Sequence, residues 1–324
     1  MTKCACLIAM LAALSACKKK QTDKPAEPTK GSSDVAAQPA DAAVVDVAAA
    51  AWDGKSPLPI TEGFQTPESV LYDADADVYL VSNINGEPLG VDDNGFIAKV
   101  SADGKITEAK WIDGAKDNIK LDAPKGMAIT GGILYVSDIN VVREFDAKTG
   151  EPKGDIKIEG ATFLNDVAAA PDGGVYVTDS GLDAKFATTG TDAVYHIGKD
   201  GKVKPLIKDK TLGAPNGIAA GSDGSVWVVT FQTGEIYQVN AKGKKVTPQK
   251  LPQGQLDGIV TLDGGELLVS SWAGSAVYRG KPGGEWKAVV ENVKSPADIG
   301  WDSKRKRLLI PSFQGNSVIL NPLE

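Results

Sequence analysis

The sequence predicts an all-β protein whose globular part is a six-bladed β-propeller of four-stranded antiparallel blades, closed by an N-terminal strand. From residue 56 onward, short runs of β-forming residues alternate with Asp-Gly and Gly-Gly turns. No stretch shows a convincing apolar period of 3.6 residues, which argues against helices. A four-residue motif recurs six times at an average spacing of about 46 residues, the length of a propeller blade.

The repeated motif is expected to begin the inner strand of each blade. Its six copies are Pro67–Val70, Pro124–Met127, Leu164–Val167, Pro215–Ile218, Leu256–Ile259 and Pro296–Ile299. A Gly-rich turn and a second strand follow each copy. In the third unit, 193–197 and the residues after a polar hairpin at 199–201 supply the third and fourth strands. We name the four strands of a blade A to D, counting outward.

The last unit is one strand short, because it stops after a third strand at 317–320. An unassigned strand-like segment, Pro57–Thr61, precedes the first unit. We therefore expect this segment to become the outer strand of the last blade, which closes the ring and removes open sheet edges.

Strand direction places all six motifs on one face, at the mouth of the central channel. The connections from strand B to strand C return to the same face and are longest at Asn83–Gly95 and Ser180–Asp192. Long loops on a rigid scaffold commonly form the rim of a binding site, so we expect the mouth to bind a small molecule.

The N-terminal residues have a different composition from the propeller. A basic start, an apolar stretch at 7–14 and the sequence Leu14-Ser15-Ala16-Cys17 resemble a bacterial lipoprotein signal. This resemblance implies that residues 1–16 are removed and that Cys17 is lipidated, anchoring the protein to a membrane of the bacterial cell envelope on its periplasmic or outer-membrane side. Residues 17–55, rich in Ala, Pro, Asp and Lys, are predicted to be a disordered tether, and residues 56–324 the propeller.

Composition and charge exclude several classes of function. The chain has 35 Lys and Arg against 42 Asp and Glu, a net charge of −7, so it lacks the basic footprint of a nucleic-acid-binding protein. It has one His, and Cys4 and Cys6 would leave with the signal, so a zinc site or a Cys/His catalytic pair lacks residues. We expect a monomer whose chemistry uses carboxylates, amides, hydroxyls or lysines, with a hard metal ion as a further option.

The second residue of the motif supplies the candidate metal site. In blade order this column contains Glu68, Lys125, Asn165, Asn216, Asp257 and Ala297. Two carboxylates and two amides converging on one channel mouth favour calcium, a cation that binds six to eight oxygen atoms. The competing interpretation treats Asn216-Gly217 and Asp257-Gly258 as turn formers, which leaves Glu68 unexplained.

At these residues the sequence resembles the gluconolactonase/regucalcin-like family and its relatives, the paraoxonases and diisopropyl fluorophosphatase. The resemblance implies a six-bladed calcium-dependent hydrolase in which Glu68, Asn165, Asn216 and Asp257 bind Ca²⁺. It also makes Asp257 the candidate general base or nucleophile. The expected function is hydrolysis of a lactone, ester or phosphoester-like substrate. The repeats alone would also fit a non-catalytic NHL-like binding or scaffold propeller.

Three positions depart from that family. Phe163 stands where the regucalcin-like enzymes have an Arg that holds a sugar acid, so sugar-lactone specificity is doubtful. His196 is the only His, which rules out a histidine pair, and it is expected to pack at the surface. Lys125 brings an ammonium group into the column, where we expect it to pair with Glu68, although it could instead polarise a substrate oxygen.

Other candidates are weaker. The acidic run 73–77 starts like a calcium loop but lacks the required Gly and Glu, so it is interpreted as the turn from strand A to strand B. Phe231, Trp272 and Phe313 follow B strands and could line an apolar pocket or pack between blades. Asp138 and Asp179 occupy equivalent positions and could orient metal ligands or cap strand ends.

Overall fold

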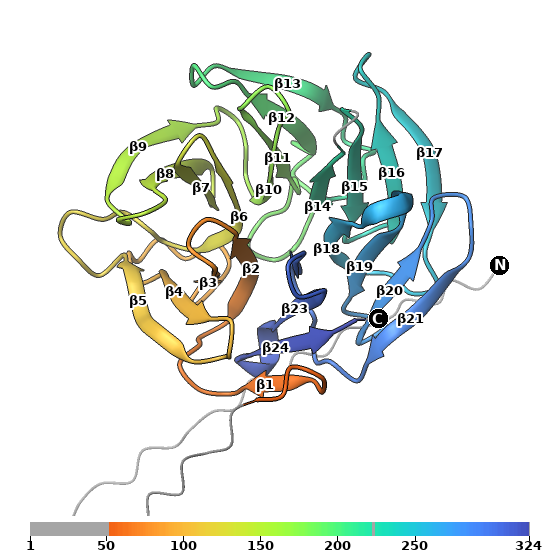
Figure 1. The fold of residues 1–324 in the computed structure, drawn as a ribbon. Helices are drawn as coiled ribbons and strands as arrows, with labels where there is room; N and C mark the ends of the chain where they lie inside the picture. The colour runs from red at the N-terminus through yellow and green to blue at the C-terminus, as the bar shows by residue number, and fades with distance from the viewer. Residues whose placement is uncertain (1–51, 222–223, 324) are drawn as a thin grey trace, which may run out of the picture. The chain divides into compact units, whose positions relative to one another are not determined.

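The computed structural model of the protein describes residues 52–221 and 224–323. Its residues form six antiparallel four-stranded sheets arranged as the blades of a ring (Figure 1), which confirms the predicted fold class. The predicted signal, Cys17 and the tether up to residue 51 lie outside the described residues. Within the described part, no helix is long and apolar enough to span a membrane.

Each blade runs from an A strand near the axis to a D strand at the rim. The first two blades contain β2 (Pro67–Asp73), β3 (Val78–Asn83), β4 (Phe96–Ser101), β5 (Ile106–Asp113), and β6 (Pro124–Thr130), β7 (Ile133–Asp138), β8 (Val141–Asp146), β9 (Pro152–Lys157). The next two contain β10 (Leu164–Ala169), β11 (Val175–Asp179), β12 (Ala193–Ile197), β13 (Val203–Lys208), and β14 (Pro215–Ala220), β15 (Val226–Thr230), β16 (Glu235–Val239), β17 (Lys245–Lys250). The fifth contains β18 (Leu256–Thr261), the short 3₁₀ helix η1 (Asp263–Gly265), β19 (Leu267–Ser271), β20 (Ala276–Gly280) and β21 (Trp286–Glu291).

The sixth blade is closed by the N-terminal strand. It contains β22 (Gly300–Asp302), β23 (Arg307–Ser312), the 3₁₀ helix η2 (Phe313–Gly315), β24 (Ser317–Pro322) and, as its outer strand, β1 (Leu58–Ile60). The antiparallel register places Leu58 opposite Leu320 and Ile60 opposite Val318. These side chains join a core cluster that also includes Val70 of the first blade. The predicted closure is therefore confirmed.

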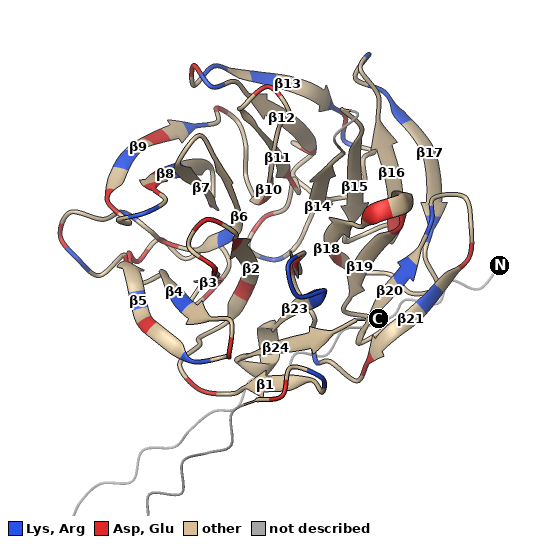
Figure 2. Cartoon of the chain, in the orientation of Figure 1, with Lys and Arg blue, Asp and Glu red and all other residues tan. Residues whose placement is uncertain are grey.

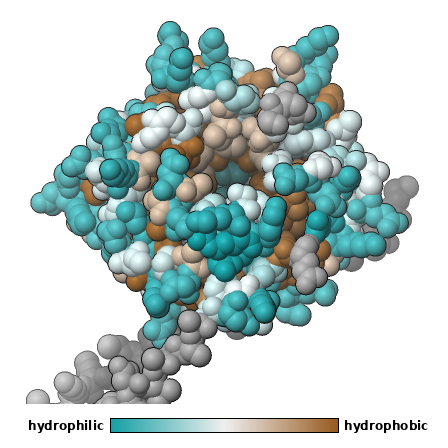
Figure 3. Space-filling view, viewed as in Figure 1, coloured by the Kyte–Doolittle hydropathy of each residue, from teal (hydrophilic) through white to brown (hydrophobic). Residues whose placement is uncertain are grey.

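The cores lie between neighbouring blades, and the charges lie outside them. One cluster joins Leu80 and Ile97 of blade one to Leu134 and Phe145 of blade two, all almost completely buried. Charged residues of both signs lie along the outer strands and loops (Figure 2). The face seen in Figure 3 is hollowed at its centre and mainly hydrophilic at its rim. The apolar surface is thus buried from blade to blade, which leaves the axis free for a site.

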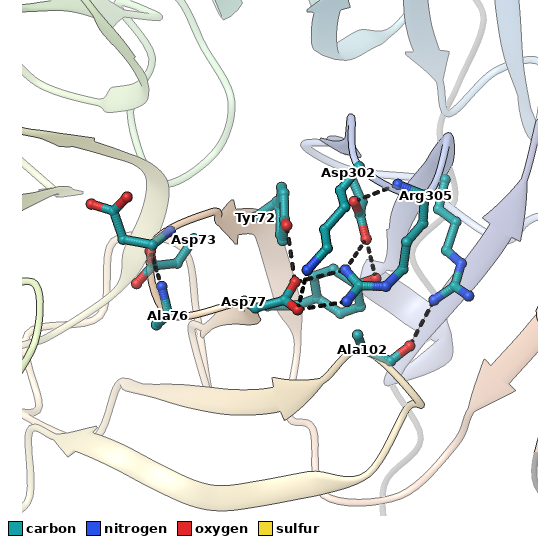
Figure 4. A network of polar contacts seen from close by, with 11 residues as sticks. Tyr72, Asp73, Ala76, Asp77, Ala102, Asp302 and Arg305 are labelled. Atoms are coloured by element: carbon teal, nitrogen blue, oxygen red, sulfur yellow. Dashed lines mark hydrogen bonds and ion pairs between the residues drawn. The ribbon is translucent and has the colours of Figure 1, made fainter.

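A polar network also joins the first blade to the last (Figure 4). Arg305, in the β22–β23 turn, donates to both carboxylate oxygens of Asp77, in the β2–β3 turn, at 2.7 Å. The guanidinium Nη1 also donates to the fully buried Asp302 carboxylate at 3.0 Å. Lys304 adds a second cation to Asp77, and these partners lower the pKa of Asp77. The run 73–77 is therefore a turn, as predicted, and one of its carboxylates ties two blades together.

We predict that Arg305→Met lowers the melting temperature by several degrees, whereas Lys304→Met changes it little. Loss of Arg305 removes a charged partner from buried Asp302, which costs about 2 kcal/mol. Lys304 has one acid partner, Asp77, and its side chain is 60% exposed. Calorimetry of the two variants measures the difference, and equal shifts would show that the network does not join the blades.

Candidate metal centre

Five column residues lie at the start of the A strands, on the face of the ring that carries the channel mouth, and the sixth, Ala297, precedes β22. In the first five blades the A strand has a register irregularity at the motif itself, for example between Pro215 and Ile218 of β14. Such a bulge changes the direction of the side chains, which in a regular ladder would alternate between the two faces of the sheet. All six column residues are buried: Glu68, Lys125, Asn165, Asn216, Asp257 and Ala297.

The glycines after the column residues allow neighbouring A strands to approach. A Cβ at Gly217 would lie 2.2 Å from the carbonyl oxygen of Asp257, and one at Gly258 would lie 2.3 Å from the backbone nitrogen of Ile299. Neither glycine has a positive φ. The turn-former interpretation of Asn-Gly and Asp-Gly is therefore wrong here, because these glycines serve close packing around the axis.

Hydroxyl groups from the B strands fix the backbone of the column. Thr178 Oγ1 donates to the carbonyl oxygen of Asn216 at 2.6 Å, and Ser270 Oγ donates to that of Ala297 at 2.7 Å. Ser137 bonds the carbonyl oxygen of Asn165 in the same way. Each bond crosses to the next blade, so the column is held by its neighbours. The signal for these residues, a Ser or Thr just before the end of a B strand, was present in the sequence and was missed.

The donor atoms of the four predicted ligands fit a hard cation. Glu68 Oε2 and Asp257 Oδ1 are buried and have no hydrogen-bond partner. Asn165 Nδ2 donates to Ser180 Oγ at 3.0 Å, and Asn216 Nδ2 donates to the carbonyl oxygen of Leu256 at 3.2 Å. With both amide nitrogens engaged in the protein, each amide has its oxygen to offer. Two unpartnered carboxylate oxygens and two amide oxygens are ligands that calcium prefers.

The four predicted metal ligands are not all acidic residues. Among the described residues, no group of three or more His, Cys, Asp and Glu side chains is arranged to hold a metal ion. The column has two carboxylates, and its other two oxygen ligands would come from amides. A centre of this kind needs further oxygen atoms from water or substrate to complete a calcium shell.

Burial and mutual repulsion perturb the carboxyl groups. Burial, and then Asp257 and Asp298, raise the pKa of Glu68 well above its ordinary value, while Lys125 lowers it. Burial and then Asp298 raise the pKa of Asp257. The indole of Trp272 lowers it, although its N–H and Asp257 Oδ1 do not meet at hydrogen-bond geometry. A cation near these groups would favour their charged forms.

Lys125 does not form the predicted ion pair with Glu68. Its Nζ donates to the carbonyl oxygen of Ala123 at 2.9 Å and lies 4.9 Å from the ring centroid of Phe163. Among the described residues, no salt bridge joins it to Glu68, so that expectation was wrong. Burial lowers the pKa of Lys125 to about 8, against the opposing effects of Asp138 and Glu68. The backbone turn before β6 gives the ammonium a carbonyl partner that the sequence could not reveal.

Two further carboxyl groups, which the sequence analysis missed, lie next to the column. Asp166 and Asp298 occupy the third motif position and are 4% and 7% exposed. Asp166 accepts from the backbone nitrogen of Ile218 at 2.7 Å, and Asp298 accepts from Ser69 Oγ. Both line a cavity of about 270 Å³ between the A strands. The signal for both residues is an Asp at the third position of their motif copies, next to the column position.

The remaining predicted residues have structural contacts outside the oxygen column. Asp138 accepts from the backbone nitrogens of residues 122 and 123, and Asp179 from those of 162 and 163, so both cap strand ends. His196 lies against Asp172 and Tyr176, away from the column, as its surface prediction requires. Phe231, Trp272 and Phe313 pack against one another at the mouth, with centroids 5.5 and 5.1 Å apart.

Comparison with known proteins places the chain in a family. Residues 66–312 match the SMP-30/Gluconolactonase/LRE-like region. The chain belongs to the SMP-30/gluconolactonase/LRE-like family. No match is found among curated proteins.

Solved structures share the fold of this family member. A gluconolactonase from Xanthomonas campestris has a TM-score of 0.65 at 19% identity, over 83% of this chain and 89% of that one. A regucalcin from Agrobacterium tumefaciens, described as a calcium-binding protein, has a TM-score of 0.61 at 19% identity, over 82% and 93%. Virginiamycin B lyase from Staphylococcus aureus has a TM-score of 0.56 at 15% identity, over 83% and 99%. At these identities the likeness shows the fold alone.

The carboxyl group of Asp298 makes a pH dependence testable. Burial raises its pKa from 3.8 to about 7, so between these values the folded state binds a proton that the unfolded state lacks. The free energy of unfolding from this group therefore falls as pH rises from about 4 to about 7. We predict that Asp298→Asn gains stability relative to the wild type across this window, on the order of a few kcal/mol in metal-free buffer. Urea unfolding at several pH values measures it, and a pH-independent difference would contradict the assignment.

Proposed function

We propose that this family member binds calcium at the channel mouth and hydrolyses a lactone, ester or phosphoester-like substrate. The observation that carries the proposal is the pair of buried carboxylate oxygens, Glu68 Oε2 and Asp257 Oδ1, that lack any partner in the described structure. Leaving such groups unpaired is costly, and a bound cation offsets that cost. Asn165 and Asn216 would complete the protein ligands, as the family resemblance implies.

The chain's own residues would divide the work. Glu68, Asn165, Asn216 and Asp257 would hold a calcium ion at the mouth, which would supply Lewis-acid chemistry toward the substrate oxygen. Asp257 would bind the ion through Oδ1, its oxygen without a hydrogen-bond partner, and would use its other oxygen to accept a proton from water or to attack the substrate. The ammonium of Lys125, held by the Ala123 carbonyl, adds a fixed positive charge beside the mouth. The ring of blades keeps these groups in place, so little reorganisation is needed.

The rival function is a non-catalytic binding propeller. One observation favours it: Lys125 already places a cation within electrostatic reach of Glu68, and this lowers the pKa of Glu68. A protein that used Lys125 in place of calcium would bind ligands without a Lewis acid. The two functions therefore differ in whether calcium binds at all.

We predict that calcium raises the melting temperature of the wild type. Binding to the folded state alone stabilises it by about 2.7 kcal/mol at a hundredfold excess over the dissociation constant. Asp257→Ala should abolish the gain because the site loses a carboxylate. Asp75→Ala, in the β2–β3 turn, is the matched control and should keep it. Differential scanning calorimetry with calcium and with chelator makes the comparison.

The outcomes separate the two functions. Any activity in a panel of esters, lactones and phosphoesters should disappear both with chelator and in Asp257→Ala. An unchanged wild-type melting curve in calcium would overturn the metal proposal and favour the binding propeller. A shift lost in Asp75→Ala but kept in Asp257→Ala would place the ion elsewhere.

We also propose that the protein is a lipoprotein of the bacterial cell envelope, anchored through Cys17. The support is the Leu14-Ser15-Ala16-Cys17 sequence and the Ala- and Pro-rich residues that follow it. We predict that Cys17→Ser moves the protein from the membrane fraction to the soluble fraction, because the acyl chains are lost. Fractionation and intact mass spectrometry test this. Unaltered fractionation, together with an unlipidated wild-type mass, would contradict it.

A further inference from the structure

An apolar collar surrounds the oxygen column. It is formed by the residue that follows each B strand, because every B strand ends at the mouth face. These residues are Ile84, Ile139, Phe231, Trp272 and Phe313 in five blades, while Ser180 takes the position in blade three. In that blade the long β11–β12 loop supplies Phe186 instead. Three consecutive blades thus present aromatic rings, and the loop extends the series toward Phe163.

The collar is held by a repeated backbone device. The residue before the repeated motif has a left-handed conformation in four blades: Thr66, Ala214, Gln255 and Ser295, with φ of 50°, 58°, 51° and 45°. Its carbonyl oxygen accepts from the backbone nitrogen of the collar residue, as Ala214 does from Phe231 at 3.0 Å and Gln255 from Trp272 at 3.0 Å. Non-glycine residues adopt this conformation at a cost. This hydrogen bond therefore fixes the backbone position of the collar residue.

The rings form one continuous series. The centroids of Phe163 and Phe186 are 6.1 Å apart, and those of Phe186 and Phe231 are 6.4 Å apart. The series continues through Trp272 to Phe313 at 5.5 and 5.1 Å. Gln232 Nε2 donates to the carbonyl oxygen of Phe186 at 3.3 Å and ties the loop to blade four. The Phe163 end of the ring series is covered by the ammonium of Lys125, which lies over the Phe163 ring.

Packing between blades accounts for only one end of this series, where buried Phe163 forms a core cluster with Leu182 and Ala214 against which Phe231 packs. Phe186 is 43% exposed, which makes it one of three large apolar side chains exposed in the described structure. Phe231, Trp272 and Phe313 are half-buried, whereas the rings within the blade cores, such as Tyr79 and Tyr237, have no exposed surface. Half-buried rings beside an acidic, metal-ligand-rich mouth retain surface for a ligand.

We propose that the collar binds the aromatic body of an aromatic carboxylic acid or its ester. The rings would stack on the ligand, and its carboxylate or ester carbonyl would reach the Lys125 ammonium and the oxygen column. This inference deepens the proposed function and rests on it for the reaction, but not for binding. A polyhydroxy sugar acid offers no flat apolar face to these rings, so the collar selects against it.

Calorimetric titration of the full mature protein with 2-naphthoate and with gluconate, in chelator and in calcium, tests the proposal. Both probes carry one carboxylate, so they differ in the body that meets the collar. We expect 2-naphthoate to bind at least about tenfold more tightly. Phe186→Ala, an exposed position, should weaken naphthoate about three- to tenfold. The matched control is Val91→Ala, an 80% exposed apolar residue of the β3–β4 loop on the same face, and it should change nothing.

Lys125→Met provides the second readout. It should weaken 2-naphthoate and leave neutral 2-naphthol unchanged, because only the carboxylate needs the ammonium. Equal affinities for naphthoate and gluconate, or equal effects of Phe186→Ala and Val91→Ala, would overturn the inference even if calcium binds and esters are hydrolysed. Tight 2-naphthoate binding that is the same in calcium and in chelator would support the collar as a ligand site and would contradict the calcium-dependent hydrolase proposal.

Discussion

Closure of the ring by β1 is the constraint on which the site depends. The pairing of β1 with β24 gives the sixth sheet its outer strand, and the Arg305–Asp77 contact joins that blade to the first. With the ring closed, six A strands start on one face, and their bulges turn the column residues together. Side chains nearly two hundred residues apart, Glu68 and Asp257, then interact through their charges. An open ring would lose the site before it lost the individual blades.

The closed ring brings together charges that would be costly in the absence of a ligand. Four carboxyl groups, those of Glu68, Asp166, Asp257 and Asp298, are buried, and burial raises the pKa of each. One ammonium, that of Lys125, is buried near them, and its pKa is lowered for the same reason. Asp166 and Asp298 are compensated by backbone or hydroxyl hydrogen bonds, whereas Glu68 and Asp257 each keep an oxygen without a partner. Asp166 and Asp298 therefore have structural partners in the channel, whereas Glu68 and Asp257 each have an oxygen available to a ligand.

Much of this architecture could be predicted from the sequence. The spacing of the motif predicted the six blades, and the missing strand predicted the closure. The repeated column predicted that Glu68, Asn165, Asn216 and Asp257 stand at the start of A strands, where the structure has them buried. The features that the sequence did not predict depend on which residues are neighbours in space. Lys125 donates to the carbonyl oxygen of Ala123, Gly217 is needed because the A strands approach closely, and Phe186 of a long loop packs near Phe231. No periodicity in the chain encodes these contacts.

A crystal structure of the wild-type protein grown with calcium, with anomalous differences measured, tests the central claim most directly. The account predicts a single strong peak at the mouth, about 2.3–2.6 Å from oxygen atoms of Glu68, Asn165, Asn216 and Asp257. Lys125 should keep its bond to the Ala123 carbonyl in that structure. No peak at the mouth, with the ammonium of Lys125 moved onto Glu68 and Asp257, would contradict it.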